Sequence, residues 1–102
     1  GTDVGICLDY GHANLMGDVA EAIETISGHL VTTHLHDNAG KRDEHLVPFA
    51  GRIDWDVAMM ATQKVGYDGV LMLEIADTGD VMQVLKKAVA ARERLEKLFV
   101  TF

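Results

Sequence analysis

Three short apolar runs, each with an acidic residue at or near its end, constrain the fold of this 102-residue chain more than any other feature. The runs occupy residues 4–9, 30–37 and 69–75, and their acidic residues are Asp9, Asp37 and Glu74. Apolar side chains follow one another almost without interruption in each run, which is typical of strands that are buried on both faces of a parallel sheet. The pattern therefore predicts three parallel β-strands.

A helical pattern follows each run. Asp18 opens a capping-box pattern, which predicts a helix over residues 18–27. Asp54 is a suitable N-cap for a helix over residues 54–65, and a stripe of apolar side chains predicts a third helix over residues 80–98. Strands that alternate with helices in this order predict an α/β fold with right-handed crossovers.

The composition narrows the class of protein. A hydrophobic content of 48% and a charged content of 25% are typical of a globular domain. The net charge of −7 argues against a nucleic-acid partner, since phosphate contacts depend on Lys and Arg. The sequence shows no signal-peptide pattern and no apolar stretch of membrane length, so we expect a cytoplasmic location and no membrane partner. The single cysteine, Cys7, lies among apolar residues, which predicts a buried thiol.

Side chains that can bind a metal ion gather at the ends of the predicted strands and in the loop after the second strand. Active sites in parallel α/β sheets form at the carboxyl ends of the strands. A mixture of carboxylates and imidazoles suits Zn, Mn, Co or Fe(II) better than calcium, which prefers oxygen ligands. The candidates are Asp9, His12, His34, His36, Asp37, Asp43, His45 and Glu74.

Some candidates also have ordinary structural explanations. Asp9 is explained equally well as the cap of a following helix. Glu74 closes an apolar strand, where an unpaired carboxylate is very costly and a cation is the natural partner. His34 and His36 fall on one face of their strand by alternation, which favours a shared site over two unrelated polar residues.

The longest irregular segment, residues 38–53, follows the second strand. Loops of this length inside compact domains are usually functional. Asp43 and His45 lie in this segment, and either a binding site or ordinary loop polarity explains them.

These residues lie in motifs that resemble those of xylose isomerase-like TIM barrels, the superfamily of the sugar phosphate isomerases and epimerases and of AP endonuclease family 2. Residues 7–14, CLDYGHAN, resemble the D-x-x-H segment after the sixth strand, and residues 33–38, THLHDN, resemble the H-x-[KHN]-D segment of the seventh strand. Residues 51–55, GRIDW, resemble the start of the seventh helix. Residues 66–69, GYDG, followed by Glu74, resemble the eighth strand. The family's P-G-x-G turn is PFAG here, which puts substrate specificity in doubt.

The resemblance implies that residues 1–102 form the C-terminal part of a TIM barrel, with three βα units matching strands six to eight, since a complete barrel needs about 250 residues. It implies that Asp9, His34 and Glu74 bind a divalent metal ion such as Mn, Co, Zn, Mg or Fe, together with a glutamate of the fifth strand that this chain lacks. His12 would contact the substrate or, with Asp43 and His45, a second metal ion.

The resemblance also implies an activity. Glu74 and His12 would be catalytic, and His36 and Asp37 would support the metal ligands. The chain would belong to an isomerase or epimerase that acts on a small sugar or sugar phosphate by proton transfer through a metal-stabilised enediolate. We expect the chain alone to be inactive, and to self-associate or pack against the missing N-terminal part of the barrel. The alternatives are an endonuclease IV-like zinc phosphodiesterase and an inert remnant that serves only as an oligomerising module.

Overall fold

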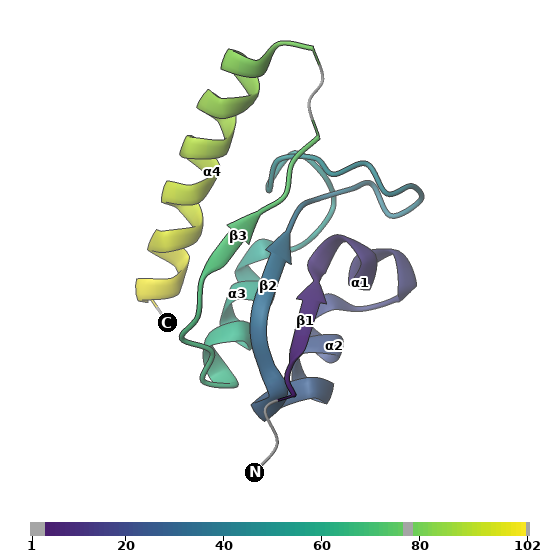
Figure 1. Ribbon diagram of the computed structural model, residues 1–102, viewed down its shortest axis with the longest axis vertical. Coiled ribbons are helices and arrows are strands. Elements are labelled where there is room, and N and C mark those ends of the chain that lie inside the picture. The colour runs from purple at the N-terminus through teal and green to yellow at the C-terminus, as the bar shows by residue number, and fades with distance from the viewer. Residues whose placement is uncertain (1–3, 77–78, 102) are drawn as a thin grey trace.

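The computed structural model describes residues 4–76 and 79–101, which form a three-stranded parallel sheet with helices packed against one face (Figure 1). The strands lie in chain order, so that the second strand is central. This arrangement confirms the predicted α/β fold and is that of a partial TIM barrel. The strands are β1 (Ile6–Asp9), β2 (Leu30–Leu35) and β3 (Leu71–Leu73).

The helices of the described ranges are joined to the strands by short connections, except for the long loop after β2. Helix α4 is the longest, and its first half extends beyond the end of the sheet in Figure 1. None of these helices is long and apolar enough to cross a membrane. The helices are α1 (Tyr10–Met16), α2 (Val19–Ile26), α3 (Trp55–Lys64) and α4 (Val81–Thr101), with a 3₁₀ turn, η1, at Ser27–His29.

Helix α1 was not predicted, and its N-cap explains why it forms. It begins directly after β1, where the Asp9 carboxylate accepts a hydrogen bond from the backbone N–H of His12 at 2.9 Å. Asp18 and Asp54 cap α2 and α3 in the same way, as the sequence predicts. The carboxylate at the end of β1 therefore serves as a helix cap, whatever else it binds.

One face of the sheet is covered by the helices and contains the hydrophobic core. Leu35 of β2 is fully buried there, and Leu8, Leu71 and Leu73 pack against the same cluster. Burial of each large apolar side chain contributes about 1.5–3 kcal/mol to folding. The large helical side chains with the deepest burial in this core are those of Tyr10, Ile23, Trp55, Met59 and Leu95.

The opposite face of the sheet is open. Strand alternation and pairing place Cys7, Asp9, His34 and Met72 on this face. Met72 is 50% exposed and Cys7 is exposed, so the expectations of strands buried on both faces and of a buried thiol are wrong. The physical reason is that every described helix after a strand returns on the same side of the sheet. In a complete barrel, side chains of other strands fill this second face.

The apolar stripe predicted for the last helix is only partly buried. Leu95 is 2% exposed in the core, whereas Val81 and Leu85 are 53% and 52% exposed. The difference follows from the extension of α4 past the sheet, which leaves its first turns without a packing surface (Figure 1).

Candidate metal centre

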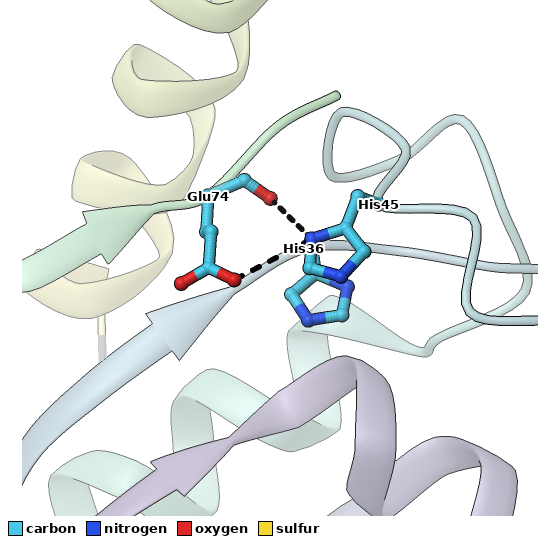
Figure 2. Close-up of side chains that lie close together, drawn as sticks. All are labelled: His36, His45 and Glu74. Atoms are coloured by element: carbon cyan, nitrogen blue, oxygen red, sulfur yellow. Dashed lines mark hydrogen bonds and ion pairs between the residues drawn. The ribbon is translucent and has the colours of Figure 1, made fainter. Parts of the chain in front are cut away.

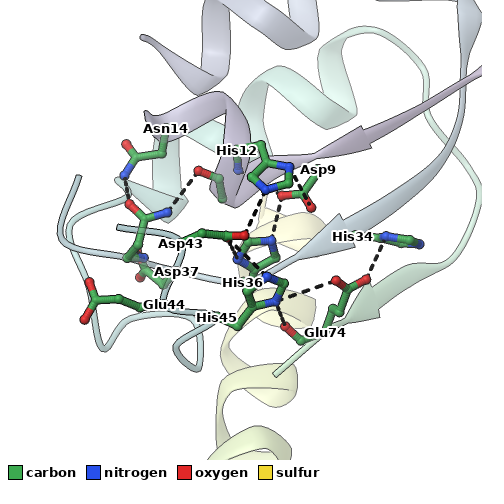
Figure 3. A network of polar contacts seen from close by, with 12 residues as sticks. Asp9, His12, Asn14, His34, His36, Asp37, Asp43, Glu44, His45 and Glu74 are labelled. Atoms are coloured by element: carbon green, nitrogen blue, oxygen red, sulfur yellow. Dashed lines mark hydrogen bonds and ion pairs between the residues drawn. The ribbon is translucent and has the colours of Figure 1, made fainter. Parts of the chain in front are cut away.

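The strand ends bring three predicted ligands together. Asp9 is paired with His34 in the sheet, and the backbone N–H of Glu74 donates to the Leu35 carbonyl at 3.0 Å, which continues the pairing of β2 with β3. His34 Nδ1 lies 2.8 Å from Glu74 Oε2. One ligand atom from each of Asp9, His34 and Glu74 lies within 4.8 Å of the other two (Figure 3). The three side chains are therefore close enough to bind one cation, although their role as ligands stays a prediction.

The loop after β2 folds back and adds two more candidates. Asp37 and Leu46 exchange two backbone hydrogen bonds of 2.8 Å, which turns the loop toward the strand ends. The Asp43 carboxylate then lies 3.0 Å from His12 Nε2 and 3.2 Å from His45 Nε2. The predicted trio of His12, Asp43 and His45 is thus assembled beside the first group.

His45 has a backbone conformation that few residues other than glycine adopt. Its φ is 54°, in the left-handed region, which costs free energy and persists only where surrounding contacts enforce it. The Ala76 N–H donates to the His45 carbonyl at 3.0 Å, and His45 Nδ1 lies 3.1 Å from the Glu74 carbonyl oxygen. These contacts fix the loop to the segment after β3 and turn the imidazole toward the cluster.

His36 is fully buried beneath these side chains. Its ring stacks on that of His45 with centroids 3.8 Å apart, and its Nε2 lies 2.6 Å from Asp9 Oδ1. A side chain on Gly11 would collide with this ring, because a Cβ there would lie 2.0 Å from His36 Cε1. Gly11 is therefore a residue that the sequence analysis missed. The motif D-Y-G-H gave the only signal, since a glycine there permits close approach.

Asp37 has a different position from the one predicted. It was expected to support an imidazole, but among the described residues its carboxylate accepts hydrogen bonds from backbone N–H groups and from an indole. It is fully buried and accepts from five donors, whose distances are 2.8–3.1 Å. Because a buried carboxylate needs such partners, the loop wraps around it. The donors are the backbone N–H groups of Asn38, Phe49, Gly51 and Ile53 and the indole Nε1 of Trp55.

A second buried residue, Asn38, also escaped the sequence analysis. Its Nδ2 donates to the Gly11 carbonyl at 2.9 Å, and its Oδ1 accepts from Asn14 Nδ2 at 2.7 Å and from Gly40 N at 2.9 Å. These bonds join α1 to the start of the loop. Together with the Asp37 carboxylate, they hold the loop in the position that presents Asp43 to His12.

Contacts within the cluster shift the pKa values of three side chains. The hydrogen bond to Asp43 raises the pKa of His12 above its ordinary value of 6.5, and the charge of Asp9 adds to this effect. Desolvation lowers the pKa of His45 and raises that of Asp43. The contacts of His45 with the Glu74 carbonyl and Asp43 outweigh desolvation and leave the pKa of His45 raised. The contacts of Asp43 with His12 and His45 likewise leave the pKa of Asp43 lowered. A cation at this site would therefore compete with protons.

Comparison with known proteins identifies the family. A sequence model of the family described as xylose isomerase-like TIM barrel matches residues 2–98. This chain belongs to the xylose isomerase-like TIM barrel family. The resemblance seen in the motifs is therefore confirmed over nearly the whole chain.

Two relatives of this xylose isomerase-like chain are named only as uncharacterized proteins. The uncharacterized protein y4fM of Sinorhizobium fredii is 41% identical over 73 residues, which are 70% of this chain and 23% of the relative. The uncharacterized protein MJ1311 of Methanocaldococcus jannaschii is 31% identical over 108 aligned positions, covering 93% of this chain and 37% of the relative. The chain thus spans less than two fifths of the length of either relative.

Solved structures give the same architecture. A D-tagatose 3-epimerase-like protein superimposes with a TM-score of 0.80 at 32% identity, over 95% of this chain and 35% of its own. A D-psicose 3-epimerase superimposes with a TM-score of 0.78 at 22% identity, over 96% of this chain and 39% of its own, and this likeness shows the fold alone.

Proposed function

We propose that this chain supplies three metal ligands of a sugar or sugar phosphate isomerase or epimerase. The observation that carries the proposal is the convergence of Asp9, His34 and Glu74 at the carboxyl end of the sheet, with ligand atoms within 4.8 Å of one another. The 32% identity to a D-tagatose 3-epimerase-like protein supports an activity on sugars.

The donor set fits a divalent metal ion of borderline character. Two carboxylates and an imidazole suit Mn, Co, Zn, Mg or Fe(II), and the fully buried imidazole of His36 lies against the same carboxylate of Asp9. A bound ion would hold the carbonyl and hydroxyl oxygens of the substrate and stabilise the negative charge of an enediolate.

Two side chains of this chain would act on the substrate. The Glu74 side chain is 43% exposed at the rim of the site, where its carboxylate can remove or return a proton at the carbon beside the carbonyl. The His12 side chain is 57% exposed, and its ring can contact a substrate hydroxyl at the rim of the site. Asp43 holds the His12 ring in place through Nε2.

The open face of the sheet supports a need for further barrel units. The chain spans 35–39% of the two epimerase-related structures described above, and apolar residues of its open face are exposed. The chain alone would lack the remaining ligand and most of the substrate wall, and we expect it to be inactive. It would pack against additional strand–helix units or against a second copy of itself. Sedimentation that shows only monomer in concentrated solution would contradict self-association. Turnover like that of a complete enzyme would contradict the expectation that the chain alone is inactive.

A second candidate function is that of an endonuclease IV-like zinc phosphodiesterase. The observation in its favour is that the six candidates of that branch lie in one connected network (Figure 3). The net charge of −7 counts against binding to DNA. Cleavage of a DNA duplex with an abasic site, measured beside ketose epimerisation on a complete barrel that contains this segment, separates the two functions. The network members are Asp9, His12, His34, Asp43, His45 and Glu74.

Metal binding tests the proposal directly. We expect the chain to bind Co²⁺ with a change in the visible spectrum of the ion. His34→Gln should weaken binding by at least the roughly 10–100-fold typical of lost supporting groups. His29→Gln is the matched control, since His29 is exposed on the 3₁₀ turn away from the cluster. Equal affinity of the two variants would contradict the assigned ligands, and a chain that binds no metal ion would favour the inert remnant.

A further inference from the structure

Two residues of the loop after β2 have positive φ angles although neither is glycine. They are His45, with a φ of 54°, and Phe49, with a φ of 79°. The left-handed region is rare for a bulky side chain, and a residue stays there only where surrounding contacts enforce it. Phe49 also stands at the first glycine position of the P-G-x-G turn, which is PFAG in this chain. A phenylalanine is therefore held in a conformation that suits glycine, and other contacts must compensate for the cost.

Both residues contact the unit formed by β3 and α4. The His45 carbonyl accepts from the Ala76 N–H at 3.0 Å, and His45 Nδ1 lies 3.1 Å from the Glu74 carbonyl oxygen and 3.6 Å from Glu74 Oε1 (Figure 2). The guanidinium carbon of Arg94, on α4, lies 3.7 Å from the centroid of the Phe49 ring. Each strained position of the loop is thus tied to the same neighbouring unit.

The contact between Arg94 and Phe49 has the geometry of a cation–π interaction. The guanidinium lies over the face of the ring, and such an attraction operates within about 6 Å of a ring centroid. The other neighbours of the ring belong to the core, since its centroid lies 6.2 Å from that of the Trp55 ring. Arg94 itself is exposed. The Phe49 ring therefore connects the core beneath the loop to a charged side chain on the surface of α4.

The backbone of Phe49 is linked to the candidate site through Asp37. The Phe49 N–H donates to Asp37 Oδ2 at 3.1 Å. Asp37 also exchanges two backbone hydrogen bonds of 2.8 Å with Leu46, the residue next to His45. A displacement of Phe49 would therefore act on the segment that presents Asp43 and His45 to the strand ends.

We propose that Phe49 and Arg94 form a clasp that holds the loop after β2 against α4, and that this clasp positions Asp43 and His45 in the candidate site. Phe49 is a positioning residue in this proposal, because it acts through the loop and not on a substrate. Its strained backbone places an aromatic ring where the guanidinium of α4 can cover it. The role of the loop residues in a site rests on the proposed function, whereas the clasp itself is a property of the folded chain.

The test is amide hydrogen exchange of the whole chain by NMR, after treatment with a chelator. The amides of Leu46 and Ala76 report opening of the loop, and those of the central strand β2 report unfolding of the whole chain. Arg94→Met should accelerate exchange at Leu46 and Ala76 by about two- to fivefold, the effect of losing an exposed cation–π contact. The amides of β2 should change less, and Arg94→Lys should lie between the two.

Two further variants separate the ring from the backbone strain. Phe49→Ala should accelerate exchange of the loop amides more than Arg94→Met, because it removes the ring and keeps the unfavourable φ. Phe49→Gly should exchange more slowly than Phe49→Ala, since glycine adopts this φ without strain. Phe49→Tyr keeps an aromatic face and should restore slow exchange. The matched control is Arg92→Met, because Arg92 lies on the same helix and pairs with Glu96 at 3.6 Å, and it should leave the loop amides unchanged.

A second measurement follows the position of the loop. The rings of His36 and His45 lie with centroids 3.8 Å apart, so their protons should give a nuclear Overhauser effect that weakens in Arg94→Met and not in Arg92→Met. Equal acceleration of the loop and β2 amides in Arg94→Met would show a contribution to overall stability alone and would overturn the clasp. Equal results for the two arginine variants would also overturn it. If Phe49→Ala does not fold, the variants of the exposed Arg94 still decide.

These outcomes are independent of metal binding. A folded chain that binds no Co²⁺ but shows the expected exchange pattern would contradict the proposed function and support the clasp. A chain that binds Co²⁺ but exchanges its loop amides equally in all variants would support the proposed function and overturn the clasp.

Discussion

The covered and open faces of the sheet are built from alternate residues of the same strands, but the covered face is packed into the core whereas the open face is exposed. On the covered face, Leu35 packs into a core with Trp55 and Met59, to which helices, strands and the loop after β2 all contribute. On the open face, Met72 is half exposed and His34 contacts the Glu74 carboxylate.

This difference separates stability from function. The covered face gains its free energy from apolar burial that needs no further partner. The open face holds a cluster of carboxylates and imidazoles, for which we propose a cation, beside apolar residues that are exposed. The chain therefore carries a packed core on one face of the sheet and an exposed candidate site on the other, and each of the following predictions tests one side of this comparison.

The largest effect is expected from shortening a methionine on the covered face. Met59→Ala should lower the free energy of unfolding by about 2–5 kcal/mol, because Met59 is fully buried. The same change at Met72, which is 50% exposed on the open face, should cost no more than about 0.5 kcal/mol. Urea denaturation followed by circular dichroism measures both. Equal losses would show that the open face is covered in solution.

A somewhat smaller loss is expected at the carboxylate that organises the loop. Asp37→Asn replaces an acceptor of five hydrogen bonds with an amide that presents a donor to some of them. Hydrogen bonds to charged groups contribute about 1.5–3 kcal/mol, so a loss of this order is expected. Trp55, the single tryptophan of the chain, donates to this carboxylate, and its fluorescence should change in the folded variant. Asp68→Asn, at an exposed position, is the control and should leave both quantities unchanged.

A pH-dependent effect is expected at the open face. The pKa of His12 in the metal-free chain should lie above 6.5, because His12 donates to Asp43. A raised pKa in the folded chain contributes stability that is fully present below 6.5 and is lost as the pH rises through the raised value. Titration of the His12 ring protons by NMR measures the shift. Asp43→Asn should return the pKa toward 6.5, and an unchanged value would contradict the assigned contact.

The smallest effect concerns the thiol of the open face. Cys7 is exposed, so in dilute solution, where the chain does not self-associate, it should react with a disulfide reagent in the folded chain about as completely as in urea. Release of the coloured thiolate measures the reaction, and Cys7→Ser supplies the blank. Protection of the thiol in the absence of urea would indicate that a second copy of the chain covers β1.

Much of the fold could be predicted because its signals are local. The apolar runs identify the three strands, and Asp18 and Asp54 mark the starts of α2 and α3 by capping the backbone a few residues later. Helix α1 was not predicted because it is short and follows β1 directly, although Asp9 was recognised as a possible helix cap. The open face escaped because an apolar run gives the same pattern whether one face of the strand is covered or both.

The residues of the candidate site were found in the sequence, but their environments were not. The sequence by itself determined that a carboxylate or an imidazole lies at or near the end of each strand, because strand direction and the caps depend on neighbours along the chain. Only the tertiary structure decided that His36 is buried without a hydrogen bond, and that Asp37 binds the loop rather than an imidazole. Burial and pairing depend on residues that are far apart in the sequence, such as Gly11 beside His36, and no local pattern records them.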